Sequence, residues 1–154
     1  MLSEAALTGS AKEAKGISRI MALEFKIYPD RRLVVARGVG TLTDPDVFNY
    51  QRDVWSRPDV QGFDELMDMT AVEEVELPSL GRARQLASLS AGMDPGAKPS
   101  KFAIVAVSEV HYGLARMYST WRASDPRSTK TVQVFRSKNE ALAWLGVTGA
   151  LEDS

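Results

Sequence analysis

Cysteine is absent from this sequence, and histidine occurs once, at His111. Without thiols the chain cannot form disulfides, iron–sulfur clusters, cysteine zinc sites or a thiol nucleophile. A catalytic zinc normally needs at least two imidazole or thiolate ligands, and a single histidine cannot supply them. We therefore expect no cofactor and no zinc or redox metal. The sequence also lacks a nucleophile–base motif, which predicts a protein that is not an enzyme.

An excess of charge of one sign is also lacking, because 19 basic and 20 acidic residues give a net charge of −1. A nucleic-acid binder would need a clustered basic patch to overcome this balance, and no such cluster occurs, so we expect no nucleic-acid partner. The longest apolar run, Phe102–Val107, is far shorter than the ~20 residues of a membrane-spanning helix. No secretion signal is recognisable at the N-terminus. These absences predict a cytoplasmic protein without a membrane span.

The chain has 154 residues, which suits one hydrophobic core and the ~100–200 residues of a single domain. Residues 1–20 are rich in alanine, serine, glycine and lysine with weak periodicity, and we expect a flexible extension there. The domain itself is expected over residues 21–147, followed by a C-terminal tail over residues 148–154.

Hydrophobic periodicity predicts an α/β fold. Glu24–Tyr28 and Leu33–Thr41 are expected to form an antiparallel hairpin, and the later strands alternate with helices. Those later strands are expected at Glu65–Thr70, Phe102–Val107 and Thr131–Phe135. The order of elements predicts a mixed five-stranded sheet whose later strands are parallel and which is flanked by helices.

The helix expected after Ser108 carries two neighbouring stripes. The first is apolar and is expected to pack on the sheet; it consists of Val110, Leu114, Met117 and Trp121. The second consists of His111, Ala115, Tyr118 and Arg122. Tyrosine and arginine are enriched at interfaces, so the second stripe is either a solvated edge or a contact face for a partner. The candidate interaction face is His111, Tyr118 and Arg122, and the hypothesis is a homodimer that uses this helix or an adjoining edge.

Several segments resemble the SpoIIAA-like members of the STAS superfamily, to which the anti-sigma-factor antagonists belong. They are the strand end Asp68–Val72, the segment Tyr112–Met117 after the strand Phe102–Val107, and the ending Val134–Leu145. The resemblance covers residues 22 to about 146. It implies a small cytoplasmic α/β module that has no cofactor and acts in regulation by docking to a protein partner.

The start of the second helix is where the resemblance departs from the family. Anti-sigma-factor antagonists carry Asp-Ser-Ser-Gly there, and a partner kinase phosphorylates a serine. The corresponding residues here are Glu76, Leu77, Pro78 and Ser79, so Leu77 replaces the first serine and the standard phosphorylatable serine is missing. Ser79 is the nearest hydroxyl and is either a displaced phosphosite or a plain helix N-cap.

Asp68 and Thr70 lie at the end of an expected parallel strand, where open α/β sheets present ligand-binding groups. A hydrogen bond that orients the loop would explain Asp68 equally well. Asp68, Thr70 and Ser79 are therefore the candidate strand-end site.

Two classes of function follow. The first is a non-enzymatic interaction module of the STAS type. The second is binding of a small molecule or lipid in a pocket like that of the CRAL-TRIO domains, whose fold is similar. An apolar cavity between helices and sheet would favour the second class, and a filled core with a flat helix face would favour the first.

Overall fold

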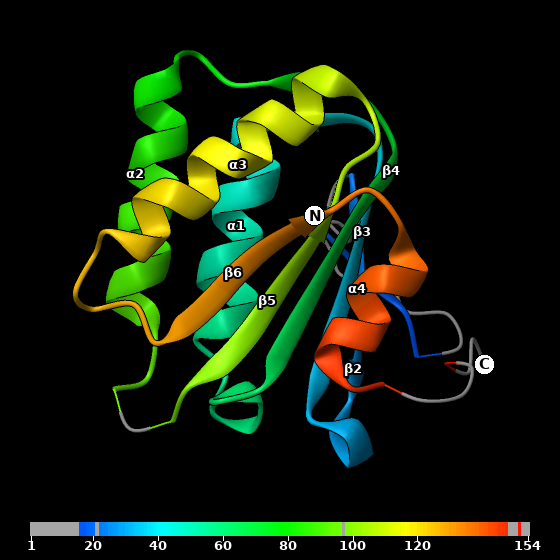
Figure 1. The fold of residues 1–154 in the computed structure, drawn as a ribbon, viewed down its shortest axis with the longest axis vertical. Helices are drawn as coiled ribbons and strands as arrows, with labels where there is room; N and C mark the ends of the chain where they lie inside the picture. Colours follow the sequence, from blue (N-terminus) through cyan, green and yellow to red (C-terminus); the bar gives the residue numbers. More distant parts are fainter. Residues whose placement is uncertain (1–15, 21, 97, 148–150, 152–154) are drawn as a thin grey trace, which may run out of the picture.

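The computed structural model describes residues 16–20, 22–96, 98–147 and 151 of the chain. Within them, six strands form one sheet in the order of the sequence (Figure 1). The strands are β1 (Ser18–Ile20), β2 (Leu23–Tyr28), β3 (Leu33–Thr43), β4 (Asp64–Glu76), β5 (Ser100–Val105) and β6 (Lys130–Phe135). The helices are α1 (Asp44–Trp55), α2 (Leu80–Met93), α3 (Glu109–Ala123) and α4 (Lys138–Leu145), with short 3-10 turns at Pro29–Arg31 and Pro58–Val60.

The sheet is mixed, as the sequence predicts. β1, β2 and β3 pair antiparallel, and β3, β4, β5 and β6 pair parallel. The strand count is six and not five, because Ser18–Ile20 pairs with β2 along its whole length. A strand of three residues is too short to show periodicity. Its strand conformation comes from pairing with the backbone of β2. Ser18–Ile20 falls in the stretch expected to be a flexible extension, and residues 1–15 lie outside the described part of the chain.

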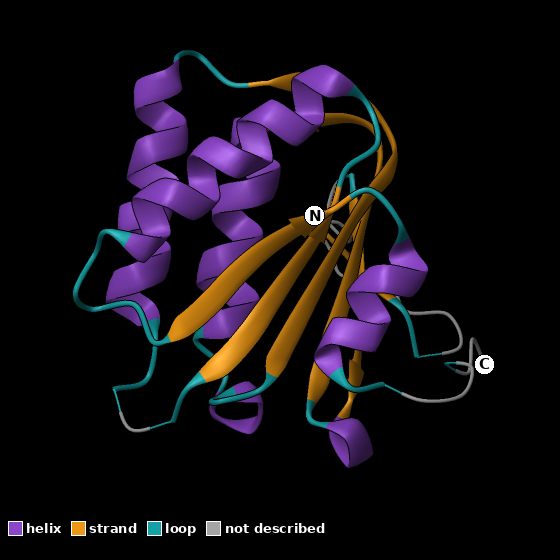
Figure 2. Ribbon diagram, in the orientation of Figure 1, coloured by secondary structure: helices purple, strands orange, loops and turns teal. Residues whose placement is uncertain are grey.

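Helices cover both faces of the sheet (Figure 2). α1 packs on β1, β2 and β3, α3 packs on β6, and α2 packs on α1 and α3 instead of on the strands. α4 covers β4, β5 and β6 from the opposite side. The core therefore has two parts, a large one under α1 and α3 and a smaller one under α4. In the described residues, no helix is long and apolar enough to cross a membrane.

The side of α3 that packs into the domain is not the one expected. Val110 is 78% exposed, and Leu114, Met117 and Trp121 are only half-buried. The second stripe of the helix is the buried one, with Arg122 only 2% exposed. The two stripes are one residue apart, a rotation of about 100° around the helix, so helical periodicity alone does not decide between them.

Candidate functional site

An apolar cavity of about 110 Å³ lies between the sheet and α1, α2 and α3. Val47 on α1 and Leu114 on α3 line its sides, while α2 closes it with Ala83 and Leu86. Methionine and isoleucine side chains rise from the strands to form its floor; they are Met67, Met69 and Ile104. Such a cavity between helices and sheet is what the ligand-binding alternative requires.

The small side chains of the helices explain why this space is not filled. The buried positions of α2 are Ala83, Ala87, Ser90 and Ala91, none of which is large. Ala115 of α3 also lines the cavity. The methionines of the floor are flexible and polarizable, so they can adapt to an occupant. The cavity is thus built from small residues on the helices and adaptable residues on the sheet.

A buried ion pair lies beside the cavity. Glu65 of β4 lines it, and the Lys130 ammonium of β6 donates to Glu65 Oε1 over 2.8 Å. The Tyr50 hydroxyl donates to Glu65 Oε2, also over 2.8 Å. Burial and the neighbouring Glu65 carboxylate raise the pKa of Tyr50 well above its ordinary value. The carboxylate is therefore held by one cation and one hydroxyl.

Aromatic rings complete the surroundings of Lys130. Its Nζ lies 3.2 Å from the centroid of the Trp55 ring and 5.8 Å from that of Phe102. Burial lowers the pKa of Lys130, while the Glu65 carboxylate acts in the opposite direction. A cation over an aromatic face is stabilised when it is desolvated, so both the carboxylate and the rings compensate the buried charge.

A second buried ion pair joins α3 to the segment after α2. Arg122 Nη2 donates to Asp94 Oδ1 over 2.6 Å, and Arg122 Nη1 donates to the Tyr118 hydroxyl over 2.8 Å. Asp94 Oδ2 accepts in addition from the backbone of Thr129 over 2.9 Å. Burial raises the pKa of Tyr118. The pair thus ties together α2, α3 and the start of β6.

The second stripe of α3, expected as a candidate interaction face, is largely turned into the domain. Tyr118 and Arg122 bond to each other and to Asp94 inside the domain, and His111 is also buried. A guanidinium can be buried when a carboxylate and a hydroxyl compensate its charge, and Asp94 comes from a different segment. His111 and Arg122 are buried, and Tyr118 is half-buried and bonded to Arg122, so these side chains do not form an exposed face.

The strand-end residues are only partly brought together. Asp68 Oδ1 accepts from the backbone N–H of Thr70 over 2.9 Å and from the Thr70 hydroxyl over 2.7 Å. The expected strand end is wrong, because β4 continues to Glu76 and both residues lie inside it. The bonds fall at an irregularity in the pairing of β4 with β3 and orient no loop. Ser79 caps α2, where its hydroxyl accepts from the backbone N–H of Arg82 over 3.4 Å. Asp68 faces the α4 side of the sheet, whereas Ser79 begins a helix of the other side.

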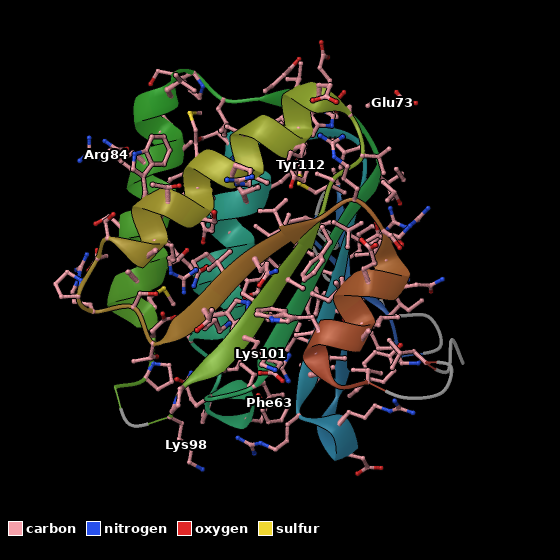
Figure 3. All side chains as sticks on the ribbon, viewed as in Figure 1. Phe63, Glu73, Arg84, Lys98, Lys101 and Tyr112 are labelled. Atoms are coloured by element: carbon pink, nitrogen blue, oxygen red, sulfur yellow. The ribbon has the colours of Figure 1, made fainter. Side chains whose placement is uncertain are left out.

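Sequence reasoning missed Glu65, Lys130 and Asp94. Glu65 and Lys130 are 65 residues apart, and no local pattern pairs them. The one available signal is an acidic residue at the start of an apolar strand, because a buried carboxylate requires a partner. Figure 3 marks the two ends of the sheet: Phe63 and Lys98 lie at one end, and Glu73 and Tyr112 lie at the other. Glu65 follows Phe63 closely, so its ion pair lies near the first of these ends.

An ion pair at the surface ties α2 to α1. Arg82 donates to both carboxylate oxygens of Asp44, over 2.9 and 2.8 Å. Its guanidinium carbon also lies 4.0 Å from the centroid of the Phe48 ring. The hydrogen bond from Arg82 lowers the pKa of Asp44 below its ordinary value of 3.8. This contact fastens the helix that closes the cavity.

Asp44→Asn is expected to reduce the loss of stability on acidification. Because the folded pKa of Asp44 is lowered, its stabilising effect is present above the unfolded value of 3.8 and disappears as the pH falls through the folded pKa. Urea midpoints measured from neutral pH downward should fall less for the variant than for the wild type. Glu73→Gln, which removes an exposed charge, is the control. Equal acid dependence of Asp44→Asn and wild type would contradict the prediction.

Comparison with known proteins supports the fold. No family model matches the chain, and no curated protein matches it. A solved structure matches it: an uncharacterized protein from the DUF3478 family with a SpoIIAA-like fold, from Shewanella loihica PV-4. The two share 20% sequence identity over 89% of this chain and 99% of that chain, with a TM-score of 0.51. At this identity the likeness establishes the fold alone, and this chain therefore has the SpoIIAA-like fold that its residues predict.

Proposed function

We propose that this domain binds a small uncharged apolar molecule in the cavity under α2 and carries out no reaction on it. The cavity between helices and sheet carries this proposal, because it is the feature that separates a ligand-binding domain from a docking module. The residues that would have formed the docking face are engaged inside the domain. Leu77, at the position of the family's first serine, lines the cavity.

The size and lining of the cavity define the ligand class. An engineered apolar cavity of roughly 150 Å³ binds benzene or xenon. The cavity of about 110 Å³ suits an aromatic ring or a short alkyl chain, and movement of its methionines would admit a somewhat longer one. A charged group would lose its hydration there, since the nearby Glu65 and Lys130 already neutralise each other. The expected ligand is therefore hydrocarbon-like.

The absence of a reaction follows from the same polar groups. Glu65 is the carboxylate nearest to the cavity, and Lys130 and Tyr50 both donate to it. A general base has to reach a proton of the substrate, whereas this carboxylate is occupied on both oxygens. Its surroundings fit a structural ion pair that shapes the cavity wall.

Benzene is the first probe. We expect saturable chemical-shift changes in amide spectra of the isotopically labelled domain, concentrated at cavity residues such as Met67, Ala83 and Ala115. The double variant Ala83→Leu/Ala115→Leu should abolish them, because the larger side chains occupy the space. Filling a real cavity should also leave the urea midpoint close to that of the wild type, whereas overpacking a filled core costs about 1–3 kcal/mol per site.

Ala123→Leu is the matched control, since Ala123 is an exposed residue of α3. This variant should bind benzene like the wild type. The proposal fails if benzene produces no saturable change in the wild type, or if Ala83→Leu/Ala115→Leu binds it unchanged.

A further inference from the structure

A second hollow lies on the opposite face of the sheet. It has a volume of about 390 Å³ and extends between α4 and the outward sides of β2, β3 and β4. α4 has eight residues and covers β4, β5 and β6. The outward sides of β2 and β3 are therefore not covered by it, and the groove lies between them and the first turn of α4. This α4 groove is separated from the apolar cavity by the sheet itself, because alternate residues of β4 serve the two sides: Glu65 and Met67 line the cavity, and Asp68 lines the groove.

Charged side chains form a row across the floor of the α4 groove. Glu24 on β2 pairs in register with Arg37 on β3, and Arg37 pairs in register with Asp68 on β4. Lys138, the first residue of α4, stands beside this row. The groove therefore presents carboxylates and cations next to each other.

Asp68 is the unusual member of the row. It is only 4% exposed, yet just one of its carboxylate oxygens is fully engaged. Oδ1 accepts both hydrogen bonds from Thr70. Oδ2 accepts no hydrogen bond from the described residues. Its ion-pair partner there is Lys138, whose Nζ lies 3.8 Å away, beyond hydrogen-bond distance. A carboxylate oxygen of a buried residue that lacks a hydrogen bond and borders a groove is suited to accept one from a ligand.

The other carboxylate of the row lies between two arginines. Glu24 pairs with Arg19 and lies 3.6 Å from Arg37 Nη1. Asp68 differs from Glu24 in burial, since its side chain is 6% exposed and that of Glu24 is 22% exposed. Lys138, whose side chain is 47% exposed, is the cation next to Asp68.

Apolar side chains also line the groove, beside the charged row. Val35 on β3 and Leu142 on α4 line it, and the Tyr28 ring does so from β2. A ligand that contacts both the charged row and these walls needs a compact polar end and a short apolar side chain.

From this arrangement we propose that the α4 groove binds a small zwitterion of the free amino acid class. The ligand's ammonium group donates to Asp68 Oδ2, its carboxylate pairs with Lys138, and its side chain lies against Val35 and Leu142. A simple anion would face the Asp68 carboxylate, and a simple cation would face the Lys138 ammonium. A molecule that carries both charges side by side satisfies both residues. This proposal is independent of the apolar cavity.

The test compares three probes that share one aromatic ring: L-phenylalanine, phenylacetate without the ammonium, and phenethylamine without the carboxylate. Titration of the full chain followed by amide chemical shifts should show that phenylalanine binds at least about tenfold more tightly than either analogue. A hydrogen bond to a charged group accounts for a factor of this size. The shifts should be centred on Val35, Asp68 and Lys138.

Asp68→Asn and Lys138→Gln separate the two ends of the ligand. Asparagine retains an oxygen that can accept from Thr70, so Asp68→Asn should fold normally. We expect Asp68→Asn to weaken the binding of phenylalanine by about tenfold. The binding of phenylacetate, which has no ammonium group, should be unchanged. Lys138→Gln should weaken the binding of phenylalanine but not that of phenethylamine, which has no carboxylate.

Lys98→Gln removes an exposed lysine at the end of the sheet where β5 begins (Figure 3), and it should leave all three probes unaffected. Phenylacetate that binds as tightly as phenylalanine would overturn the proposal in favour of a plain anion site. The proposal would also fail if phenylalanine showed no saturable binding, or if Lys98→Gln and Lys138→Gln changed its binding equally.

Discussion

Glu65→Ala is expected to lower the free energy of unfolding by about 3–5 kcal/mol, the range found when one partner of a buried ion pair is removed. The variant would leave the Lys130 ammonium buried without its carboxylate, which lies 2.8 Å away in the wild type. The Tyr50 hydroxyl would lose its acceptor as well. Urea unfolding followed by tryptophan fluorescence, with the free energy extrapolated to water, measures the difference.

A double variant identifies the cause of this loss. Glu65→Met/Lys130→Met removes both charges while keeping much of the volume, and such replacements are often neutral or stabilising. It should therefore be more stable than Glu65→Ala. If Glu65→Ala costs less than about 1 kcal/mol, the range of an exposed pair, then Lys130 reaches water and the buried ion pair is not structural.

Arg122→Ala is expected to cost about 3–5 kcal/mol for the same physical reason. It would leave the Asp94 carboxylate in the interior, where Arg122 Nη2 lies 2.6 Å from Asp94 Oδ1. The Tyr118 hydroxyl would lose a donor, and the space of a long side chain would be left empty. The result is measured by the same urea titration.

Arg122→Met/Asp94→Asn is the matched comparison. Asparagine at position 94 can still accept from the Thr129 backbone, and methionine fills part of the space of the arginine. This double variant should recover part of the loss seen in Arg122→Ala. A surface position of α3 would instead make Arg122→Ala nearly neutral, and a cost below about 0.5 kcal/mol would refute the buried orientation of the helix.

Much of the fold could be predicted from the sequence because its signals are local. Apolar runs such as Phe102–Val107 and capping serines such as Ser108 and Ser137 act through neighbours a few residues away. Each of the two serines accepts a hydrogen bond from the backbone three residues ahead, as its position predicts. The mixed sheet then follows from the order of the elements. The strand Ser18–Ile20 was missed because its pairing with β2, and not its own composition, makes it a strand.

Less of the candidate site could be predicted from the sequence. Asp68 and Thr70 were singled out because a parallel strand was expected to end there; β4 continues to Glu76, yet the two side chains do bond to each other. The apolar cavity was foreseen only as a possibility, since a cavity depends on what several segments leave unfilled. The pairing of Glu65 with Lys130 depends on a contact between β4 and β6 around the intervening β5.

By itself, the sequence determined the types and order of most elements and the lack of thiol chemistry. The tertiary structure decided which stripe of α3 is buried. Both stripes have helical spacing, and a hydrophobicity pattern favours the apolar one. Asp94, contributed by the segment after α2, reversed that preference, because a compensated guanidinium can be buried where an isolated one cannot.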